Sequence, residues 1–163
     1  MTEVFVSIGS NIDPAVNVRG AVETLRRRFG CLQVSGVYQS KAVGFDGPDF
    51  YNLVVGFDTQ LPIHDLRAVL RDVERVYGRV RQQTGYASRT LDLDLLLYGD
   101  EILREQGVEL PRAEITEQAF VLGPLAEIAG TRVHPALGVT FRELWARFGR
   151  SKGGLTAVAL TLG

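Results

Sequence analysis

The chain has 163 residues, of which 45% are hydrophobic and 23% charged, and its formal net charge is −1. This composition is typical of a folded globular protein and excludes disorder as the main state. It gives no electrostatic reason to expect a nucleic acid or a membrane surface as partner. One cysteine cannot form an intramolecular disulfide, and two histidines are too few to favour a Cys/His zinc site.

The apolar runs and the N-terminal segment bear on location. No apolar run approaches the ~18 residues of a membrane span. The N-terminal segment carries Glu3 and no basic leader. The length fits one folded unit. We therefore expect a single domain over residues 1–163, in the cytoplasm, without an obligate protein partner.

The first hundred residues alternate between patterns typical of strands and of helices. They predict, in chain order, strand 3–7, helix 14–29, strand 32–38, strand 50–57, helix 62–77 and strand 90–98. Asp13 is the expected N-cap of the first helix, with Pro14 at its first position, and residues 8–11 are expected to form a turn. The order β-α-β-β-α-β predicts an α+β fold with a largely antiparallel sheet and two helices on one face.

The last third of the sequence is less regular. Residues 120–129 are apolar and predict a helix after Pro124. A capping box at residues 140–143 predicts the start of a further short helix. Residues 155–162 are expected to form a terminal strand.

The segment Arg89-Thr-Leu-Asp-Leu-Asp94 carries the strongest chemical signal. Residues i and i+2 of a strand point the same way, so Asp92 and Asp94 project together, with Cα atoms roughly 6.5–7 Å apart. Two adjacent carboxylates are tolerable when they are solvated or when a divalent cation lies between them. Mg²⁺ takes such oxygen ligands together with substrate phosphates. A motif this short also occurs by chance, so a solvated polar strand face is the alternative.

Arginines flank the polar loop that precedes this strand. Arg79, Arg81 and Arg89 can clamp phosphate oxygens, or they can simply pair with carboxylates. Together with the aspartates they favour phosphoryl or nucleotidyl transfer over a solvated face.

The helix 62–77 carries a basic stripe that includes Arg67, Arg71 and Arg75. We interpret this stripe as mostly a solvated face, because acidic residues interrupt it and can pair along the helix. Glu74 is interpreted as a glutamate of the helix surface, and the alternative is that it orients an arginine or a ribose.

Asn52 and two phenylalanines admit two interpretations. An amide has a donor and an acceptor, so Asn52 can recognise the edge of a heterocycle, or it can face water at the end of a strand. Phe50 and Phe120 can sandwich a planar ring, although core positions are the commoner use of phenylalanine. His64 and His134 have no partner in the sequence, and we interpret both as structural.

Several segments, in this order and at this spacing, resemble a known family. They are Val6–Asn11, Pro48–Asn52, Gly78–Arg81, Arg89–Asp94 with Leu97–Gly99, and Ala119–Leu122 with Pro124. They look like the 6-hydroxymethyl-7,8-dihydropterin pyrophosphokinases of folate biosynthesis, and the resemblance extends from residue 3 to about residue 130. It implies a ferredoxin-like α+β core, with helices packed on a mainly antiparallel sheet.

The resemblance also implies a reaction and a set of site residues. The enzyme transfers pyrophosphate from ATP to the hydroxymethyl group of the pterin and releases AMP, with small-molecule substrates and two Mg²⁺ ions. The residues implied are Arg79, Arg89, Asp92 and Asp94 for catalysis, the two aspartates also holding the metal; Val43, Gly44, Phe50, Asn52 and Phe120 for the pterin; and Glu74, Arg81 and Arg112 for the nucleotide.

The sequence departs from the family pattern on the nucleotide side. Residues 86–88 (Tyr-Ala-Ser) stand where a Trp followed by Gly-Pro is usual. Gln82 and Gln118 stand where basic residues are common, and Arg112 stands where a histidine is usual. The alternatives are therefore a paralogue that acts on another pterin or donor, and a catalytically idle pterin- or nucleotide-binding module. The retained carboxylate pair argues against the module, which has no need of a metal site.

Overall fold

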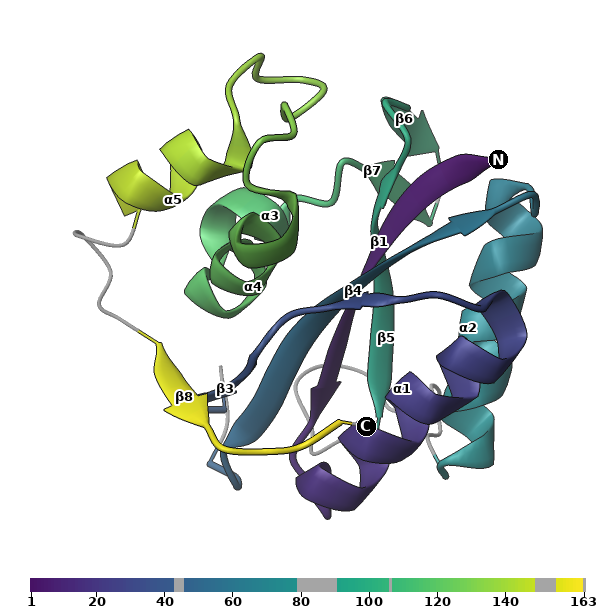
Figure 1. The fold of residues 1–163 in the computed structure, drawn as a ribbon, viewed down its shortest axis with the longest axis vertical. Helices are drawn as coiled ribbons and strands as arrows, with labels where there is room; N and C mark the ends of the chain where they lie inside the picture. The colour runs from purple at the N-terminus through teal and green to yellow at the C-terminus, as the bar shows by residue number, and fades with distance from the viewer. Residues whose placement is uncertain (43–45, 79–90, 106, 149–154, 163) are drawn as a thin grey trace.

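The computed structural model describes residues 1–42, 46–78, 91–105, 107–148 and 155–162, in which a sheet separates two layers of helices (Figure 1). The strands are β1 (Thr2–Ser10), β2 (Gln33–Val34), β3 (Val37–Ser40), β4 (Phe50–Thr59), β5 (Asp92–Tyr98), β6 (Leu103–Glu105), β7 (Val108–Leu110) and β8 (Thr156–Val158). The helices are α1 (Pro14–Phe29), α2 (Ile63–Val76), α3 (Glu114–Glu117), α4 (Ala119–Ala129) and α5 (Phe141–Phe148). None of the helices in these residues is long and apolar enough to cross a membrane.

The main sheet pairs its strands antiparallel, in the order β5-β1-β4-β3-β8, and β2 also pairs with β4. Along the chain, β1, β3, β4 and β5 alternate with α1 and α2 as β-α-β-β-α-β. Their spatial order, β5-β1-β4-β3, is that of a ferredoxin-like core, so the predicted fold class is confirmed. β6 and β7 pair with each other in a separate hairpin.

α1 and α2 cover one face of the sheet, as the sequence predicted. Alternate residues of a strand point to opposite faces, and on this face Val4, Val6 and Ile8 of β1 are fully buried. They belong to the same core cluster as Leu25 of α1 and Leu70 of α2. The amphipathic stripes of the two helices therefore bury the first face.

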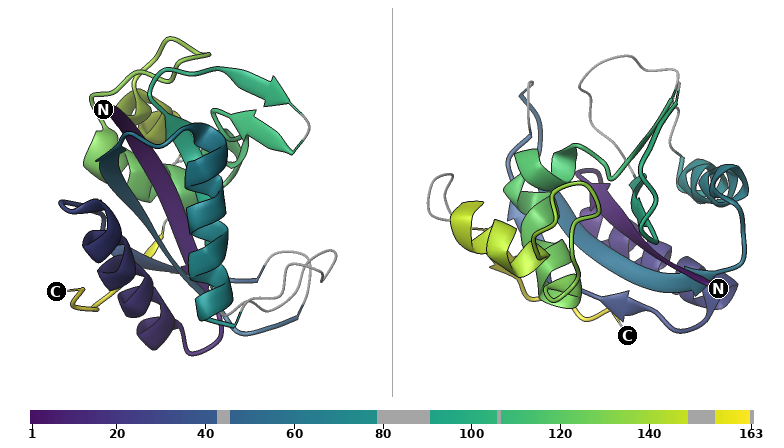
Figure 2. Two further views of the ribbon diagram at one scale, coloured as in Figure 1. Left: turned by 90° about the vertical axis from the view of Figure 1, so that its right-hand side faces the viewer. Right: turned by 90° about the horizontal axis from the view of Figure 1, so that it is seen from above.

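α3, α4 and α5 cover the second face of the sheet (Figure 2). Phe5 of β1 and Val54 of β4 pack there with Leu122 and Leu125 of α4 and Phe141 of α5. This cover comes from the last third of the chain, which the β-α-β-β-α-β prediction did not include.

The junction between β1 and α1 differs from the prediction. β1 continues to Ser10, so residues 8–10 form strand and not a turn. Asp13 is the N-cap with a φ of 43°, but its side chain makes no capping hydrogen bond. Its carbonyl accepts the N–H of Asn17 at 3.0 Å. An N-cap side chain usually caps a helix from an extended backbone. Asp13 has a left-handed backbone instead, and its side chain does not cap the helix.

The predicted strand 32–38 is broken into β2 and β3. The Ser35 hydroxyl accepts the N–H of Val54 at 2.9 Å and donates to the carbonyl of Gly36 at 2.8 Å. The Ser35 side chain thus pairs with a backbone N–H of β4 that a continuous strand would pair with a backbone carbonyl.

The helices of the last third follow the prediction in part. α4 begins at Ala119 and continues through Pro124, so it starts earlier than expected. The proline removes one helical hydrogen bond, and burial of residues such as Leu122 stabilises the helix around it. The predicted N-cap of the short helix is confirmed, because the Thr140 hydroxyl accepts the N–H of Glu143 at 3.2 Å, which is one of the two hydrogen bonds of a capping box. The predicted terminal strand is reduced to β8.

Candidate functional site

Three neighbouring strands bring candidate residues together at one end of the sheet. Gly9 of β1 lies directly opposite Asn52 of β4 on one side and Asp92 of β5 on the other. Further along β1, Ser7 lies opposite Asp94. Opposite residues share a face and have Cβ positions about 4.5–5.5 Å apart. The amide and both carboxylates therefore occupy one surface, on the side of the sheet that α4 covers.

The two aspartates lie at the start of β5, which is an edge strand of the sheet. Asp92 and Asp94 are half-buried, whereas Leu93 and Leu95 are buried in the core on the opposite face. This is the alternation that the sequence predicted. The leucines anchor the strand, and the strand holds the two carboxylates side by side.

Arg112 lies beside the carboxylate pair. Its backbone N–H donates to the carbonyl of Leu96 in β5 at 3.0 Å, which fixes the segment next to the aspartates. One terminal nitrogen of the guanidinium lies 3.7 Å from Oδ1 of Asp94, and Nε pairs with Glu114. Burial by itself lowers the pKa of Arg112, but the carboxylates of Asp94 and Glu114 outweigh burial and raise that pKa. The side chain therefore stays a cation.

The carboxylate pair fits a divalent cation of the magnesium type. Mg²⁺ takes oxygen ligands, keeps several waters, and binds proteins through one or two carboxylates and substrate phosphates. Among the described residues, no group of three or more His, Cys, Asp or Glu side chains is placed to hold a metal ion. Asp92 and Asp94 thus offer an open oxygen donor set, which suits an ion shared with a phosphate substrate.

Glu74 is buried, and the interpretation of it as a surface glutamate was wrong. Its side chain is 1% exposed, and Oε2 accepts the backbone N–H of Leu93 at 2.7 Å. α2 therefore bonds to β5 at the residue between the two aspartates. Glu74 supports the strand that carries the carboxylates, and its contact with a nucleotide stays a prediction.

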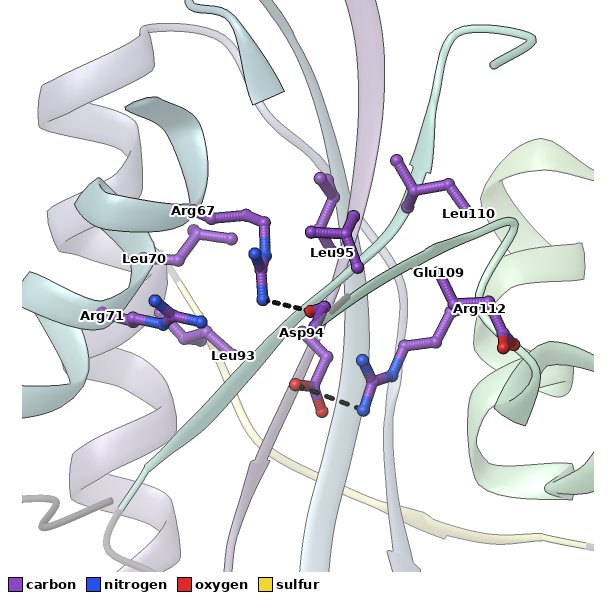
Figure 3. Close-up of a pocket in the computed structure, with 11 residues that line it drawn as sticks. Arg67, Leu70, Arg71, Leu93, Asp94, Leu95, Glu109, Leu110 and Arg112 are labelled. Carbon is purple, nitrogen blue, oxygen red and sulfur yellow. Dashed lines mark hydrogen bonds and ion pairs between the residues drawn. The ribbon is translucent and has the colours of Figure 1, made fainter. Parts of the chain in front are cut away.

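A cleft of about 270 Å³ lies beside Asp94, between α2, β5 and the β6–β7 hairpin (Figure 3). Arg67 and Arg71 of α2 line this cleft together with Asp94 and Arg112. Arg67 also donates to the carbonyl of Gly107 at 2.7 Å, which ties α2 to the hairpin. The basic stripe of α2, interpreted from the sequence as a solvated face, is in part the wall of this cleft.

Sequence analysis missed the contribution of the hairpin to the cleft. β6 and β7 have three residues each, too few for a periodic pattern to stand out. The signal that was present is the alternation of Val108, Glu109 and Leu110, of which the two apolar residues are buried.

On the other side of Gly9, β3 orients the amide of Asn52. Nδ2 donates to Oγ of Ser40 at 2.7 Å and to the carbonyl of Tyr38 at 3.3 Å. A carbonyl can only accept, so the amide nitrogen must face Tyr38, and Oδ1 is directed elsewhere. Glu127 of α4 holds Tyr38 in turn. The hydrogen bond to that carboxylate, followed by burial, raises the pKa of Tyr38 to about 12.

Phe50 and Phe120 lie near the same surface. Phe50 precedes Asn52 by two residues in β4, so the two side chains share a face. Phe120 is in the first turn of α4 and packs at the margin of the core on that face. Both rings are half-buried. Their use as a sandwich for a planar ring stays a prediction.

Five residues that the resemblance implied lie outside the described residues: Val43, Gly44, Arg79, Arg81 and Arg89. The departures at Gln82 and at residues 86–88 lie there too. The described part of the site therefore rests on β1, β4, β5, α2 and the segment around Arg112.

Comparison with known proteins identifies the family. The family model for 7,8-dihydro-6-hydroxymethylpterin-pyrophosphokinase (HPPK) matches residues 5–130. The 2-amino-4-hydroxy-6-hydroxymethyldihydropteridine pyrophosphokinase of Methylorubrum extorquens is 38% identical over 90% of this chain and 94% of its own length. The enzyme of the same name from Haemophilus influenzae is 34% identical over 83% of this chain and 86% of its own length. The one from Synechocystis sp. is 37% identical over 85% of this chain and 72% of its own length.

Solved structures share the fold. Wild-type HPPK-DHPS of Plasmodium falciparum has a TM-score of 0.72 at 12% identity, and the match covers 91% of this chain and 45% of that one. The S436F/A437G/A613T triple mutant of that protein with STZ-DHP has a TM-score of 0.73. This chain spans less than half of those longer proteins, and such low identity shows the fold alone. Because the family model spans most of this chain and the curated relatives match over most of their own length, the chain belongs to the 7,8-dihydro-6-hydroxymethylpterin-pyrophosphokinase family.

Proposed function

We propose that the surface shared by β4, β1 and β5 is the reaction centre of this enzyme. The chain is an ATP-dependent diphosphotransferase of folate biosynthesis. It transfers pyrophosphate from ATP to the hydroxymethyl group of 6-hydroxymethyl-7,8-dihydropterin, giving AMP and the pterin diphosphate. The observation that carries the site is the register that sets Asn52 and Asp92 on either side of Gly9. A pterin at Asn52 and a phosphate at Asp92 then share one surface.

The cleft beside β5 is the proposed nucleotide site. Arg67, Arg71 and Arg112 supply cations along it, and arginine recognises phosphate through paired N–H groups. Arg81 is a further proposed contact of the nucleotide. Glu74 contributes to the nucleotide site by fixing the position of β5.

Asp92 and Asp94 are the proposed ligands of two Mg²⁺ ions. Bound there, Mg²⁺ neutralises phosphate charge. The approach of Arg112 to Asp94 supports the assignment, because it shows that this carboxylate already attracts a cation. Arg79 and Arg89 are the proposed phosphate-handling arginines of the adjoining loop.

On the pterin side, we place the ring between Phe50 and Phe120, with its edge N–H groups donating to Oδ1 of Asn52. Aromatic stacking contributes about 0.5–1.5 kcal/mol beyond the burial of area. Val43 and Gly44 are proposed contacts from the loop that joins β3 to β4.

Catalysis in this site consists of positioning and charge neutralisation. The hydroxymethyl oxygen attacks the β-phosphorus in line and loses its proton to solvent, the bond from the β-phosphorus to the oxygen of the α-phosphate breaks, and AMP leaves. Arginines that neutralise charge on the phosphate oxygens lower the barrier of the reaction. Holding the two substrates at adjacent positions makes their reaction effectively unimolecular. A strong protein base is not required. None of the described residues lining the cleft is a histidine.

We also propose that residues 1–163 form one domain that acts in the cytoplasm on small molecules, without an obligate protein partner. Both core clusters are built on the same sheet, which supports a single folded unit.

The test is to incubate the purified protein with ATP, Mg²⁺ and 6-hydroxymethyl-7,8-dihydropterin and to quantify the products by chromatography. We expect one AMP for each pterin diphosphate, and no product when EDTA removes the metal. Release of ADP in place of AMP would indicate different donor chemistry. Binding of both substrates without any product would indicate an idle binding module.

A further inference from the structure

Glu127 of α4 binds two groups of the chain segment that contains β3. Its Oε2 accepts the backbone N–H of Gly36 at 2.7 Å, and its Oε1 accepts the hydroxyl group of Tyr38. Glutamate is usually an exposed residue that water hydrates, and Glu127 is exposed. Both of its carboxylate oxygens are nevertheless bound by one short stretch of chain. Hydrogen bonds to an ionised carboxylate are stronger than those between neutral groups, so Glu127 ties α4 to this stretch.

β3 has few backbone bonds of its own to the sheet. Its register with β4 runs from Tyr38 to Ser40, and its other neighbour, β8, has three residues. Just before β3, the Ser35 side chain replaces a backbone group in the bond to β4. The two hydrogen bonds of Glu127 are formed at Gly36, before the strand, and at Tyr38, within it. They therefore hold β3 where the sheet holds it weakly.

The position of β3 determines the direction of the Asn52 amide. Tyr38 lies directly opposite Asn52 across the sheet. The Tyr38 carbonyl and the Ser40 hydroxyl accept hydrogen bonds from Nδ2 of Asn52. A shift of β3 would move both acceptors and turn the amide with them. Glu127 thus acts on the proposed pterin site through Tyr38 and without touching the ligand.

The helix that carries Glu127 also carries Phe120. The two residues are seven positions apart in α4. At 3.6 residues per turn this spacing is almost two full turns, so their side chains share one face of the helix. Phe120, in the first turn, is one proposed wall of the pterin slot. The carboxylate therefore links the helix that presents this ring to the strand that orients the amide.

We infer that Glu127 is a positioning residue of the pterin site: together with Tyr38 it holds α4 and β3 at a fixed separation, so that Phe120 and the Asn52 amide are in place before the pterin binds. The inference rests on the function proposed above. A site that is already ordered loses less conformational freedom on binding. The nucleotide cleft is lined by α2, β5 and the β6–β7 hairpin, so the effect of Glu127 is specific to the pterin.

The experiment compares wild type with Glu127→Ala, Glu127→Gln, Tyr38→Phe and the double variant Glu127→Ala/Tyr38→Phe. Pterin affinity is measured by calorimetry in the presence of Mg²⁺ and a non-hydrolysable ATP analogue, and analogue affinity is measured without pterin. The unfolding temperature of each variant is recorded. Glutamine keeps an acceptor for the N–H of Gly36 and a donor for the Tyr38 hydroxyl. Glu23→Ala is the control, because it removes an exposed glutamate from α1, which covers the opposite face of the sheet.

We expect Glu127→Ala to weaken pterin binding by about tenfold, the size of effect seen when a partner that orients a binding side chain is removed. Tyr38→Phe should weaken it by about fivefold, because one of the two hydrogen bonds remains. The double variant should bind no more weakly than Glu127→Ala, because both residues act through the same link. Glu127→Gln should stay within about threefold of wild type. Analogue affinity should stay within about twofold in every variant, and the control should match wild type throughout.

Four results would overturn the inference, and a fifth would overturn the proposed function. Unchanged pterin affinity in Glu127→Ala, with an active wild type, contradicts the role of Glu127 and leaves the proposed function standing. A lowered unfolding temperature with equal losses of pterin and analogue binding shows that Glu127 serves only the fold. Losses that add in the double variant, or a Glu127→Gln variant as weak as Glu127→Ala, contradict the hydrogen-bonded link. A wild type that binds no pterin and forms no AMP overturns the proposed function and the inference with it.

Discussion

Asp92 and Asp94 present two like charges on one face of β5, which disfavours the ionised pair unless cations or solvent compensate. Arg112 supplies part of this compensation, 3.7 Å from Asp94. A divalent cation that both carboxylates ligate would compensate both charges.

Replacing either aspartate should abolish most activity and leave the fold intact. We expect Asp92→Asn and Asp94→Asn to lower turnover by at least about a hundredfold, the size of effect seen when a charge contact to a transition state is lost. AMP formation at saturating substrate measures this, and circular dichroism checks the fold. Asp58→Asn is the matched control, since Asp58 is exposed near the far end of β4. Near-normal AMP formation by either variant would remove the metal role from this pair.

Glu74 is a buried residue of α2 that accepts a hydrogen bond from the same strand, β5. Its Oε2 accepts the N–H of Leu93, and this hydrogen bond ties α2 to β5 between the two aspartates. A buried N–H that loses its acceptor costs about 1–3 kcal/mol. The position of the carboxylates along β5 thus depends on a residue that is almost inaccessible to solvent.

We expect Glu74→Leu to lower the free energy of unfolding by about 1–3 kcal/mol, because the N–H of Leu93 is left unpaired. Glu74→Gln keeps an acceptor and should retain more of that stability. Urea titration of both variants measures the difference. Glu23→Leu, at an exposed position of α1, is the control for adding a leucine. Equal stability of the Leu and Gln variants would contradict the supporting role.

Among the elements, the segment after β8 connects two parts of the fold that are distant in sequence (Figure 1). β8 pairs with β3, whose Tyr38 carbonyl and Ser40 hydroxyl hold the amide of Asn52. Beyond β8 the chain runs along α1, where Arg19 donates to the carbonyl of Thr161 at 3.1 Å and Arg26 to that of Leu162 at 3.0 Å. β8 itself covers the edge of β3, which would otherwise be open to another strand.

Leu160 and Leu162 pack against the core cluster of the first face, whereas Thr161 between them is exposed. We expect Leu160→Ala and Leu162→Ala to lower the free energy of unfolding by about 1 kcal/mol each, as befits half-buried leucines. Thr161→Ala should change it by less than about 0.5 kcal/mol. Chemical denaturation measures all three. An unchanged free energy of unfolding in the two leucine variants would show that the segment does not contribute to the core.

For the molecule as a whole, the sheet is stable only when helices cover both of its faces. The helix layer on the second face depends on the connection between α4 and α5. His134 organises this connection. Its Nδ1 accepts the N–H groups of Ala136 at 3.1 Å and Leu137 at 3.2 Å, and its ring centroid lies 5.8 Å from that of Phe141. Nδ1 must be unprotonated to accept these bonds. The structural role predicted for His134 fits this arrangement.

Burial lowers the pKa of His134 in the folded protein below its ordinary value of 6.5. The unfolded chain then binds more protons, so the stability that neutral His134 contributes is fully present above about pH 6.5 and is lost as the pH falls from there toward the folded-state pKa. Urea titrations at several pH values should show this loss. His134→Asn keeps an acceptor without the titration and should flatten the slope. An unchanged slope in His134→Asn would assign the pH dependence to other groups.

The elements that are long enough to show a hydrophobic period could be predicted from the amino-acid sequence alone. The apolar stripe of the helix at residues 62–77 and the alternation of Asp92 and Asp94 with leucines predicted α2 and the shared face of the two carboxylates, and both are confirmed. These features depend on neighbours along the chain, because helix and strand periods fix which side chains share a face. The order of such elements was enough to predict an α+β fold with a largely antiparallel sheet and two helices on one face.

Which residues meet across long sequence distances depends on tertiary packing, and local patterns could not predict it. Glu74 follows Leu66 and Leu70 at four-residue spacing, but glutamate is seldom buried, and only the packing of α2 against β5 shows that this one is. Nothing in β1 alone places Gly9 between Asn52 and Asp92, since strand register follows from the packing of both faces and not from one strand. Arg67 lines a cleft because a short hairpin, with too few residues to show a period, folds back beside α2.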